Sequence, residues 1–369
     1  MYKTFITGCG LWTNIISSVN IFQNTNINEF PLLNTSSLCN QNKLPVIKTI
    51  AREDRALVND IAQMAMVSSL EAFNMAERYM TFTEEEKENF LVYLVNETMP
   101  FKYEVFEQYF HKHNNGNSNY WADLGELKDE FNPLDMLRLL STNPLYHVSK
   151  LFNLRGGGYP LRKMSLGSLS AIQDILHMSN GVNTKAILTA IGDLTSLDNL
   201  CYFQKADIVA NEVNSDGIMP ACGVASIILE NNQNDYNLPK NYLAQIIEVR
   251  SHFKPDNKVT GLDWQHLLTL VPSKVINNKL NIITYDNGIK YLAENEMDAI
   301  LQIFPKATVY NYKKYIGYTG KANNLIDLVL ALSDKRIGVG EYVLINGVGN
   351  NAGLGYILIQ KLQQLSGKK

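Results

Sequence analysis

The chain has 369 residues, of which 46% are hydrophobic and 19% are charged, with 33 Lys and Arg against 36 Asp and Glu. This composition excludes a disordered chain, and the near-neutral balance excludes the basic footprint typical of nucleic-acid binding. The four cysteines (Cys9, Cys39, Cys201 and Cys222) form no CxxC pair, so the sequence predicts neither a zinc site nor a disulfide framework. An average domain has about 25% charged residues, so this chain is expected to have a large interior or surface hidden in an oligomer.

The first half of the chain alternates apolar strands with amphipathic helices. Gly8-Cys9-Gly10 lacks the third glycine of a dinucleotide-binding loop, so it predicts a tight turn after a buried strand. Gly156 to Pro160 also predicts a turn, and the aromatic, irregular stretch at about 101–135 indicates an insertion. The expected helices are 52–78, 143–152 and 165–178, and the expected strands are 3–7, 91–95, 186–191 and 223–229.

A polar stretch at 231–241 predicts the boundary between two halves, 1–235 and 236–369. After it, strands are expected at 242–250, 280–284, 307–310 and 342–345, and helices at 295–304 and 322–332. Strands that alternate with helices through both halves predict an α/β fold with sheets buried between helices.

The N-terminus does not have the pattern of a signal peptide. Gly8, Cys9 and Gly10 interrupt its apolar residues, and no A-x-A site follows. No apolar stretch approaches the roughly 20 residues of a membrane-spanning helix. We therefore expect a cytoplasmic protein without membrane contact.

Short motifs follow one another through nearly the whole chain in an order that resembles the β-ketoacyl synthases of the thiolase fold. The segments that carry this resemblance are Thr7-Gly8-Cys9-Gly10, Asn143-Pro144, Leu154-Arg155-Gly156-Gly157, 165–172, Ile191-Gly192-Asp193, Ser215-Asp216-Gly217-Ile218, Leu229-Glu230, 313–317 and 347–351. The resemblance implies a five-layer αβαβα architecture with two pseudo-symmetric halves. It implies no cofactor and no metal.

The resemblance also assigns places to the residues that such enzymes use, namely a Cys nucleophile, two His and a Lys. The nucleophile position holds Ser165, and a serine hydroxyl is a far poorer nucleophile than a thiolate unless a base activates it. Asp286 or Tyr285 stands at the first His, Tyr318 stands at the second, and Lys313 is retained. These replacements indicate that condensation is lost.

The resemblance therefore suggests a chain length factor, a non-catalytic ketosynthase-like subunit that pairs with an active ketosynthase in a heterodimer. Acyl carrier protein would reach it through that complex. The pathway would make fatty acids or polyketides, such as aryl polyenes. Met136, Leu137, Leu139 and Leu140 match a stretch that crosses the dimer in related synthases, and they are the expected walls of the acyl tunnel.

Two other functions stay open at this stage. Ser165, activated by Asp286 or another base, could make the chain an acyltransferase or hydrolase acting on acyl carrier thioesters. The chain could also be a scaffold only. Simpler structural roles are available too: Ser165 as a helix N-cap, Cys222 (at the place of a family Glu) as a small buried hydrophobe, and Lys313 as a surface residue or as part of a charge network.

Overall fold

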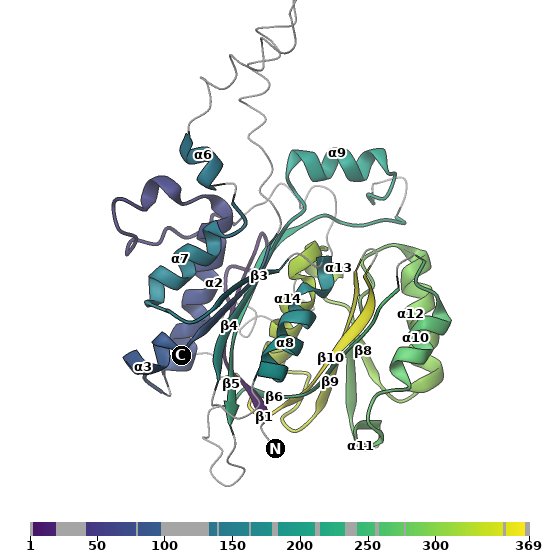
Figure 1. Cartoon of the computed structure of the whole chain (residues 1–369). Coiled ribbons are helices and arrows are strands. Elements are labelled where there is room, and N and C mark those ends of the chain that lie inside the picture. Colours follow the sequence, from purple (N-terminus) through teal and green to yellow (C-terminus); the bar gives the residue numbers. More distant parts are fainter. Residues whose placement is uncertain are drawn as a thin grey trace, which may run out of the picture.

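The computed structural model describes most of the chain (Figure 1). The described residues are 3–19, 42–78, 80–96, 133–138, 140–161, 164–178, 184–210, 215–232, 242–254, 258–276, 278–349 and 352–365. The expected insertion at 101–135 and the boundary at 235 and 236 fall almost entirely outside these ranges.

The first half carries five strands and the helices between them. In chain order these are β1 (Lys3–Thr13), the short 3₁₀ helix η3 (Arg55–Leu57), α2 (Asp60–Glu77), α3 (Glu84–Glu88), β2 (Leu91–Val95), α6 (Pro133–Arg138), α7 (Asn143–Phe152), β3 (Gly158–Leu161), the 3₁₀ helix η4 (Met164–Leu166), α8 (Gly167–Met178), β4 (Lys185–Asp193), α9 (Leu197–Lys205) and β5 (Cys222–Asn232).

The second half follows the same plan. Its elements are β6 (Ala244–His252), α10 (Gly261–Leu268), α11 (Ser273–Ile276), β7 (Leu280–Ile283), α12 (Lys290–Ile303), β8 (Thr308–Tyr310), α13 (Lys313–Ile316), the 3₁₀ helix η5 (Gly320–Ala322), α14 (Asn323–Ser333), β9 (Tyr342–Gly349) and β10 (Gly353–Lys361).

Within the described residues, ten strands form one sheet in the order β3-β2-β4-β5-β1-β6-β10-β9-β7-β8. Counted from the outer edge, each half repeats one arrangement. The first three strands run parallel to one another, and the fourth and fifth strands each pair antiparallel with the strand before them. The halves join where Thr4–Ile6 of β1 pair with Ala244–Ile246 of β6. This repeated order confirms two pseudo-symmetric halves.

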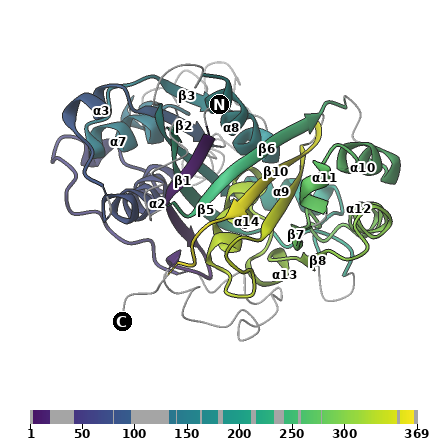
Figure 2. The same cartoon turned by 90° about the horizontal axis from the view of Figure 1, so that it is seen from below.

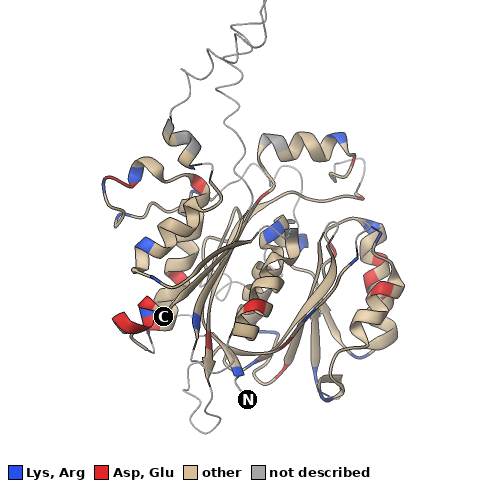
Figure 3. Cartoon of the chain, in the orientation of Figure 1, with Lys and Arg blue, Asp and Glu red and all other residues tan. Residues whose placement is uncertain are grey.

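Five layers follow from where the helices lie (Figures 1 and 2). The central helices α8 and α14 lie between the two halves of the sheet, and their apolar residues form one core with the inner faces of the strands. Helices α2 and α7 cover the outer face of the first half, and α10 and α12 cover that of the second. The expected αβαβα architecture is confirmed. Charged side chains gather on peripheral helices such as α3 and α12, whereas most of the sheet is uncharged (Figure 3).

The expected turn at Gly8-Cys9-Gly10 is wrong, because β1 runs without a break from Lys3 to Thr13. The two glycines serve close packing instead. A Cβ atom on Gly8 would overlap the carbonyl oxygen of Ala72, and one on Gly10 would overlap that of Ser68. Helix α2 therefore lies directly against the strand at a distance that side chains would prevent.

The expected turn at Gly156 to Pro160 is also corrected. Gly158–Leu161 form the edge strand β3, which pairs in parallel with β2. Pro160 lacks a backbone N–H, and such a residue is tolerated on an edge strand because only one side of the strand is paired. No helix in the described part of the chain combines the length and apolar character needed to cross a membrane.

Candidate functional site

Ser165 lies in the one-turn helix η4, immediately before α8 begins at Gly167. Its hydroxyl donates to the backbone carbonyl of Val348 in β9, and the residue is only 3% exposed. The nucleophile position of the family pattern therefore lies inside the protein, at the start of a central helix and against the sheet of the other half.

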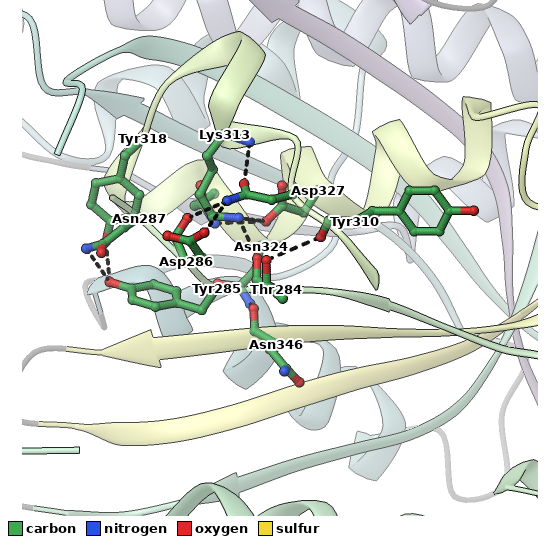
Figure 4. A network of polar contacts seen from close by, with 12 residues as sticks. Thr284, Tyr285, Asp286, Asn287, Tyr310, Lys313, Tyr318, Asn324, Asp327 and Asn346 are labelled. Atoms are coloured by element: carbon green, nitrogen blue, oxygen red, sulfur yellow. Dashed lines mark hydrogen bonds and ion pairs between the residues drawn. The ribbon is translucent and has the colours of Figure 1, made fainter. Parts of the chain in front are cut away.

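Two tyrosines meet beside Ser165. The hydroxyls of Tyr285 and Tyr318 lie 3.0 Å apart, and their rings are close to perpendicular. The Ser165 side chain lies close enough to the Tyr285 phenol to lower its pKa, and Asn287 Nδ2 donates to the Tyr285 hydroxyl at 3.4 Å. Figure 4 shows Tyr285, Tyr318 and Asn287 together at one end of the polar network. The structure thus brings together the three positions that the family pattern assigns to Cys, His and His.

Each tyrosine is placed by its backbone. Tyr285 follows β7, and Glu296 Oε1 accepts from its N–H at 2.8 Å. Tyr318 follows α13, where its N–H donates to Met219 and its carbonyl accepts from Ala221, so the segment before β5 holds it. The backbone of Tyr285 is therefore held by α12, and that of Tyr318 by the segment before β5.

Asp286, the other candidate on this loop, has different partners. Its carboxylate accepts from Asn311 Nδ2 at 2.6 Å and from the Gly288 N–H at 3.2 Å. Among the described contacts it shares no hydrogen bond with Ser165. Of the two loop residues, Tyr285 is therefore the one that faces the serine.

The chemistry available around Ser165 is that of neutral hydroxyls. Burial raises the pKa of Tyr285 well above its ordinary value, and the neighbouring Tyr318 raises it further. The phenol therefore keeps its proton at neutral pH and cannot accept one from the serine. A serine nucleophile needs an adjacent base, and none of the groups that hydrogen bond to Ser165 in the structure can serve as one.

Lys313 lies inside the protein rather than on its surface. Its Nζ is 2.7 Å from Asp327 Oδ2 and donates to the carbonyl of Thr284 at 2.7 Å. The side chains of the pair are 3% and 0% exposed. Burial raises the pKa of Asp327, and the charge of Lys313 opposes that change. Because Thr284 precedes Tyr285, the lysine also ties down the loop that carries the tyrosine.

Glu296 was missed by sequence reasoning. It lies on α12, where it accepts from the N–H groups of Tyr285 and Asp286 and, at 2.7 Å, from Asn346 Nδ2. Burial raises its pKa to about 7. The sequence held one signal, because Glu296 shares a helical face with the buried Ala299 and Ile300. A carboxylate on a buried face needs partners, and the backbone of the tyrosine loop supplies them.

The remaining predicted residues lie apart from this cluster. Cys222 is 8% exposed and its Sγ lies 3.4 Å from Met64 Sδ in the outer core of the first half. Leu137 and Leu140 are 46% and 52% exposed, at and just after the end of α6. The side chain of Met136 and the whole of Leu139 lie outside the described residues. In the part of the chain that the structure describes, no cluster of His, Cys, Asp and Glu could hold a metal ion.

Comparisons with known proteins agree on the fold. No protein-family model and no curated protein matches the chain. A type II polyketide synthase ketosynthase, solved with its acyl carrier protein and a bound hexaketide, aligns with a TM-score of 0.75 at 15% identity, over 98% of this chain and 99% of that one. A β-ketoacyl synthase from Burkholderia phymatum aligns with a TM-score of 0.73 at 13% identity, over 98% and 100%.

The ishigamide ketosynthase/chain length factor aligns with a TM-score of 0.69 at 12% identity, over 98% of this chain and 100% of that one. Identities this low establish the fold rather than the activity. The alignments extend over nearly the whole chain and agree with the repeated strand order described above. The chain has the thiolase-like fold of the ketosynthases and chain length factors.

Proposed function

We propose that this protein is a non-catalytic ketosynthase-like subunit, a chain length factor, which pairs with an active β-ketoacyl synthase and shapes its acyl tunnel. The observation that carries the proposal is the proximity of Ser165, Tyr285 and Tyr318, which the resemblance assigns to three catalytic positions. Condensation needs a thiolate and two imidazoles there, and this chain supplies three hydroxyls.

The retained architecture supports a role that depends on shape. Lys313, Asp327 and Glu296 hold the loop of Tyr285 in place, and the described side chains beside Ser165 are hydroxyls. Such a pattern is expected of a subunit whose surface and interior must match those of a catalytic partner.

Two surface features support pairing through the first half. The edge strand β3 carries no neighbour on its outer side in the described sheet, and such an edge can pair with another chain. Leu137 and Leu140 expose large apolar side chains near the same half, which favours burial against a partner. Pairing of unlike subunits with one fold preserves a pseudo-two-fold interface. One matched structure is itself described as a ketosynthase/chain length factor.

The test is co-expression of the tagged chain with a candidate ketosynthase from the same genome. We expect the two chains to purify together and to condense acyl carrier thioesters only as a pair. The chain alone should show no acyl adduct by intact-mass measurement. An adduct on the chain alone that disappears in Ser165→Ala would overturn the proposal in favour of a serine acyltransferase or hydrolase.

The tunnel role has its own test in the same pair. Leu140→Phe should shorten the product, because a larger side chain leaves less room in the acyl tunnel. Leu140→Ala should lengthen it, because a smaller side chain leaves more room. Leu262→Ala is the control, since Leu262 is 75% exposed on α10 in the outer layer of the other half. The same two substitutions are made at Leu137. If the pair still assembles and no Leu140 or Leu137 variant changes the product length, only a scaffold role remains.

A further inference from the structure

The outer edge of β3 presents an incomplete row of hydrogen-bonding groups. In the described sheet β3 is the outermost strand of the first half, and its neighbour there is β2, with which it pairs in parallel. Gly158 and Pro160 are exposed, whereas Tyr159 and Leu161 are partly buried. Another chain can add a strand on the outer side of such an edge.

The register of β3 with β2 determines which residues face outward. Val92 of β2 lies opposite Gly158, and its N–H donates to the carbonyl of Gly157 at 2.9 Å. In a β-strand the N–H and C=O groups of one residue point to the same side, and those of the next residue point to the other side. The odd-numbered residues of β3 therefore direct their groups to β2, whereas Gly158 and Pro160 direct theirs outward.

Pro160 makes this outer edge uneven in donors and acceptors. The carbonyls of Gly158 and Pro160 are two acceptors, but the N–H of Gly158 is the single donor, because proline has no N–H. A partner strand can receive one hydrogen bond from these two residues and can donate two to them. The edge is therefore best matched by a strand that carries an N–H at every position.

A second copy of this chain is a poor match for the edge. Around a two-fold axis the two β3 strands would run antiparallel, and two facing residues of an antiparallel ladder exchange both of their hydrogen bonds. In each register that places Pro160 opposite a residue of the other copy, the proline contributes no donor. The symmetric pair therefore lacks two hydrogen bonds, one for each proline, whereas an unlike strand without proline leaves only one hydrogen bond unmade.

We propose that Pro160 directs β3 towards the edge strand of an unlike chain and away from a second copy of this chain. The strand that covers the edge belongs to the ketosynthase partner and has no proline at the facing position; this assignment rests on the function proposed above. A carbonyl that becomes buried without a donor is costly. Because the symmetric pair contains two such carbonyls and the unlike pair contains one, Pro160 favours the heterodimer over the homodimer.

The test restores the missing N–H with Pro160→Ala. The variant and the unmodified chain, each without a partner, are compared by sedimentation equilibrium. The variant gains two hydrogen bonds in the symmetric dimer, so its self-association constant should rise by at least about fivefold. Pro305→Ala is the control, because Pro305 lies on an exposed turn before β8. This control should associate as the unmodified chain does.

The pair with a co-expressed ketosynthase separates this inference from the proposed function. Pro160→Ala gains one hydrogen bond there, so the logarithm of the heterodimer association constant should rise about half as much as that of self-association. The β3 amides of the unmodified chain should exchange more slowly in the pair than in the chain alone, measured by mass spectrometry.

Three results would each overturn the inference: equal self-association of Pro160→Ala and the unmodified chain, a larger gain in the pair than in the chain alone, or β3 amides that stay unprotected in an assembled pair. Failure to form any pair would instead count against the proposed function. The comparison of the two chains without a partner would still decide whether Pro160 opposes self-association.

Discussion

The two halves of this chain repeat one strand order, yet their central helices differ in burial and in the charged residues that they carry. Helix α8 of the first half starts beside Ser165 and leaves Asp174 and His177 exposed towards its end. Helix α14 of the second half is buried along its whole length, and Asp327 lies inside it as the partner of Lys313. The halves therefore share their topology, whereas the polar and charged side chains differ between the two central helices.

The difference should also affect the stability of the two halves. A buried ion pair seldom adds much net stability, but breaking one is costly because it leaves an unpaired charge in the interior. The second half contains such a pair, together with the buried Glu296. The first half has Ser165 at the position that the resemblance assigns to the nucleophile.

The buried ion pair of the second half should show the largest effect. Lys313→Met leaves the Asp327 carboxylate without a cation, and the free energy of unfolding should fall by about 3–5 kcal/mol, measured by chemical denaturation. Lys314→Met, at the exposed neighbouring position, should change it by no more than about 0.5 kcal/mol. The double variant Lys313→Met with Asp327→Leu should recover much of the loss. A loss below about 1 kcal/mol in Lys313→Met would contradict this account of the second half.

The pKa of Glu296 should make stability depend on pH. The carboxyl titrates near pH 4.5 when unfolded and near 7 when folded. The folded state therefore binds more protons between these values, and the stabilisation is present below about pH 4.5 and lost as the pH rises through 7. The loss should be about 3 kcal/mol at most.

Denaturation of Glu296→Gln between pH 5 and 8 should show a flatter profile, because Gln does not ionise. Glu294→Gln, at a surface position on the same helix, should keep the wild-type slope. A slope in Glu296→Gln as steep as that of the unmodified chain would show that another group causes the pH dependence.

The contact between the halves should be sensitive to a single methyl group. Gly192 lies near the end of β4, where a Cβ would overlap the backbone carbonyl oxygen of Thr319 in the second half. Gly192→Ala should lower the free energy of unfolding by about 1–3 kcal/mol, visible as a lower Tm. At Gly338 the same Cβ would meet only the flexible side chain of Glu341, so Gly338→Ala should have a much smaller effect. Equal effects would mean that the halves can move apart at Gly192.

The N-caps of the two outer helices should show the smallest difference. Asn59 accepts from the Ala62 N–H to cap α2, and its Nδ2 also donates to the carbonyl of Arg138 at 2.6 Å. Thr260 caps only α10. Both alanine variants should cost about 1 kcal/mol, but only Asn59→Ala should speed hydrogen exchange in α6. Asn59→Asp keeps the cap and lacks the donor, so it should reproduce the exchange effect with little loss of stability. Unchanged exchange in both Asn59 variants would contradict the link to α6.

Local sequence signals placed several elements closely. The strand Leu91–Val95 and the helix Asn143–Phe152 have the expected bounds. In the helix the reason is chemical, because Pro144 favours the first turn and Asn153 adopts the left-handed conformation that ends it. The strand Gly353–Lys361 and the helix Gly261–Leu268 were not predicted. The ordered motifs nevertheless identified the fold, since each depends on a short stretch of chain.

The pattern of apolar residues along the chain predicted the alternation of strands and helices through two halves, and the resemblance to a family suggested places for Ser165, Tyr318 and Lys313. The choice of Tyr285 over Asp286 as the residue beside Ser165 needed the tertiary structure, because it rests on the contact of Tyr285 with Tyr318, 33 residues away in the chain. The tertiary structure also decided that Gly8 and Gly10 continue a strand, since the helix that requires them begins fifty residues after Gly10. Periodicity describes neighbours in the chain, whereas burial and hydrogen-bond partners belong to neighbours in space.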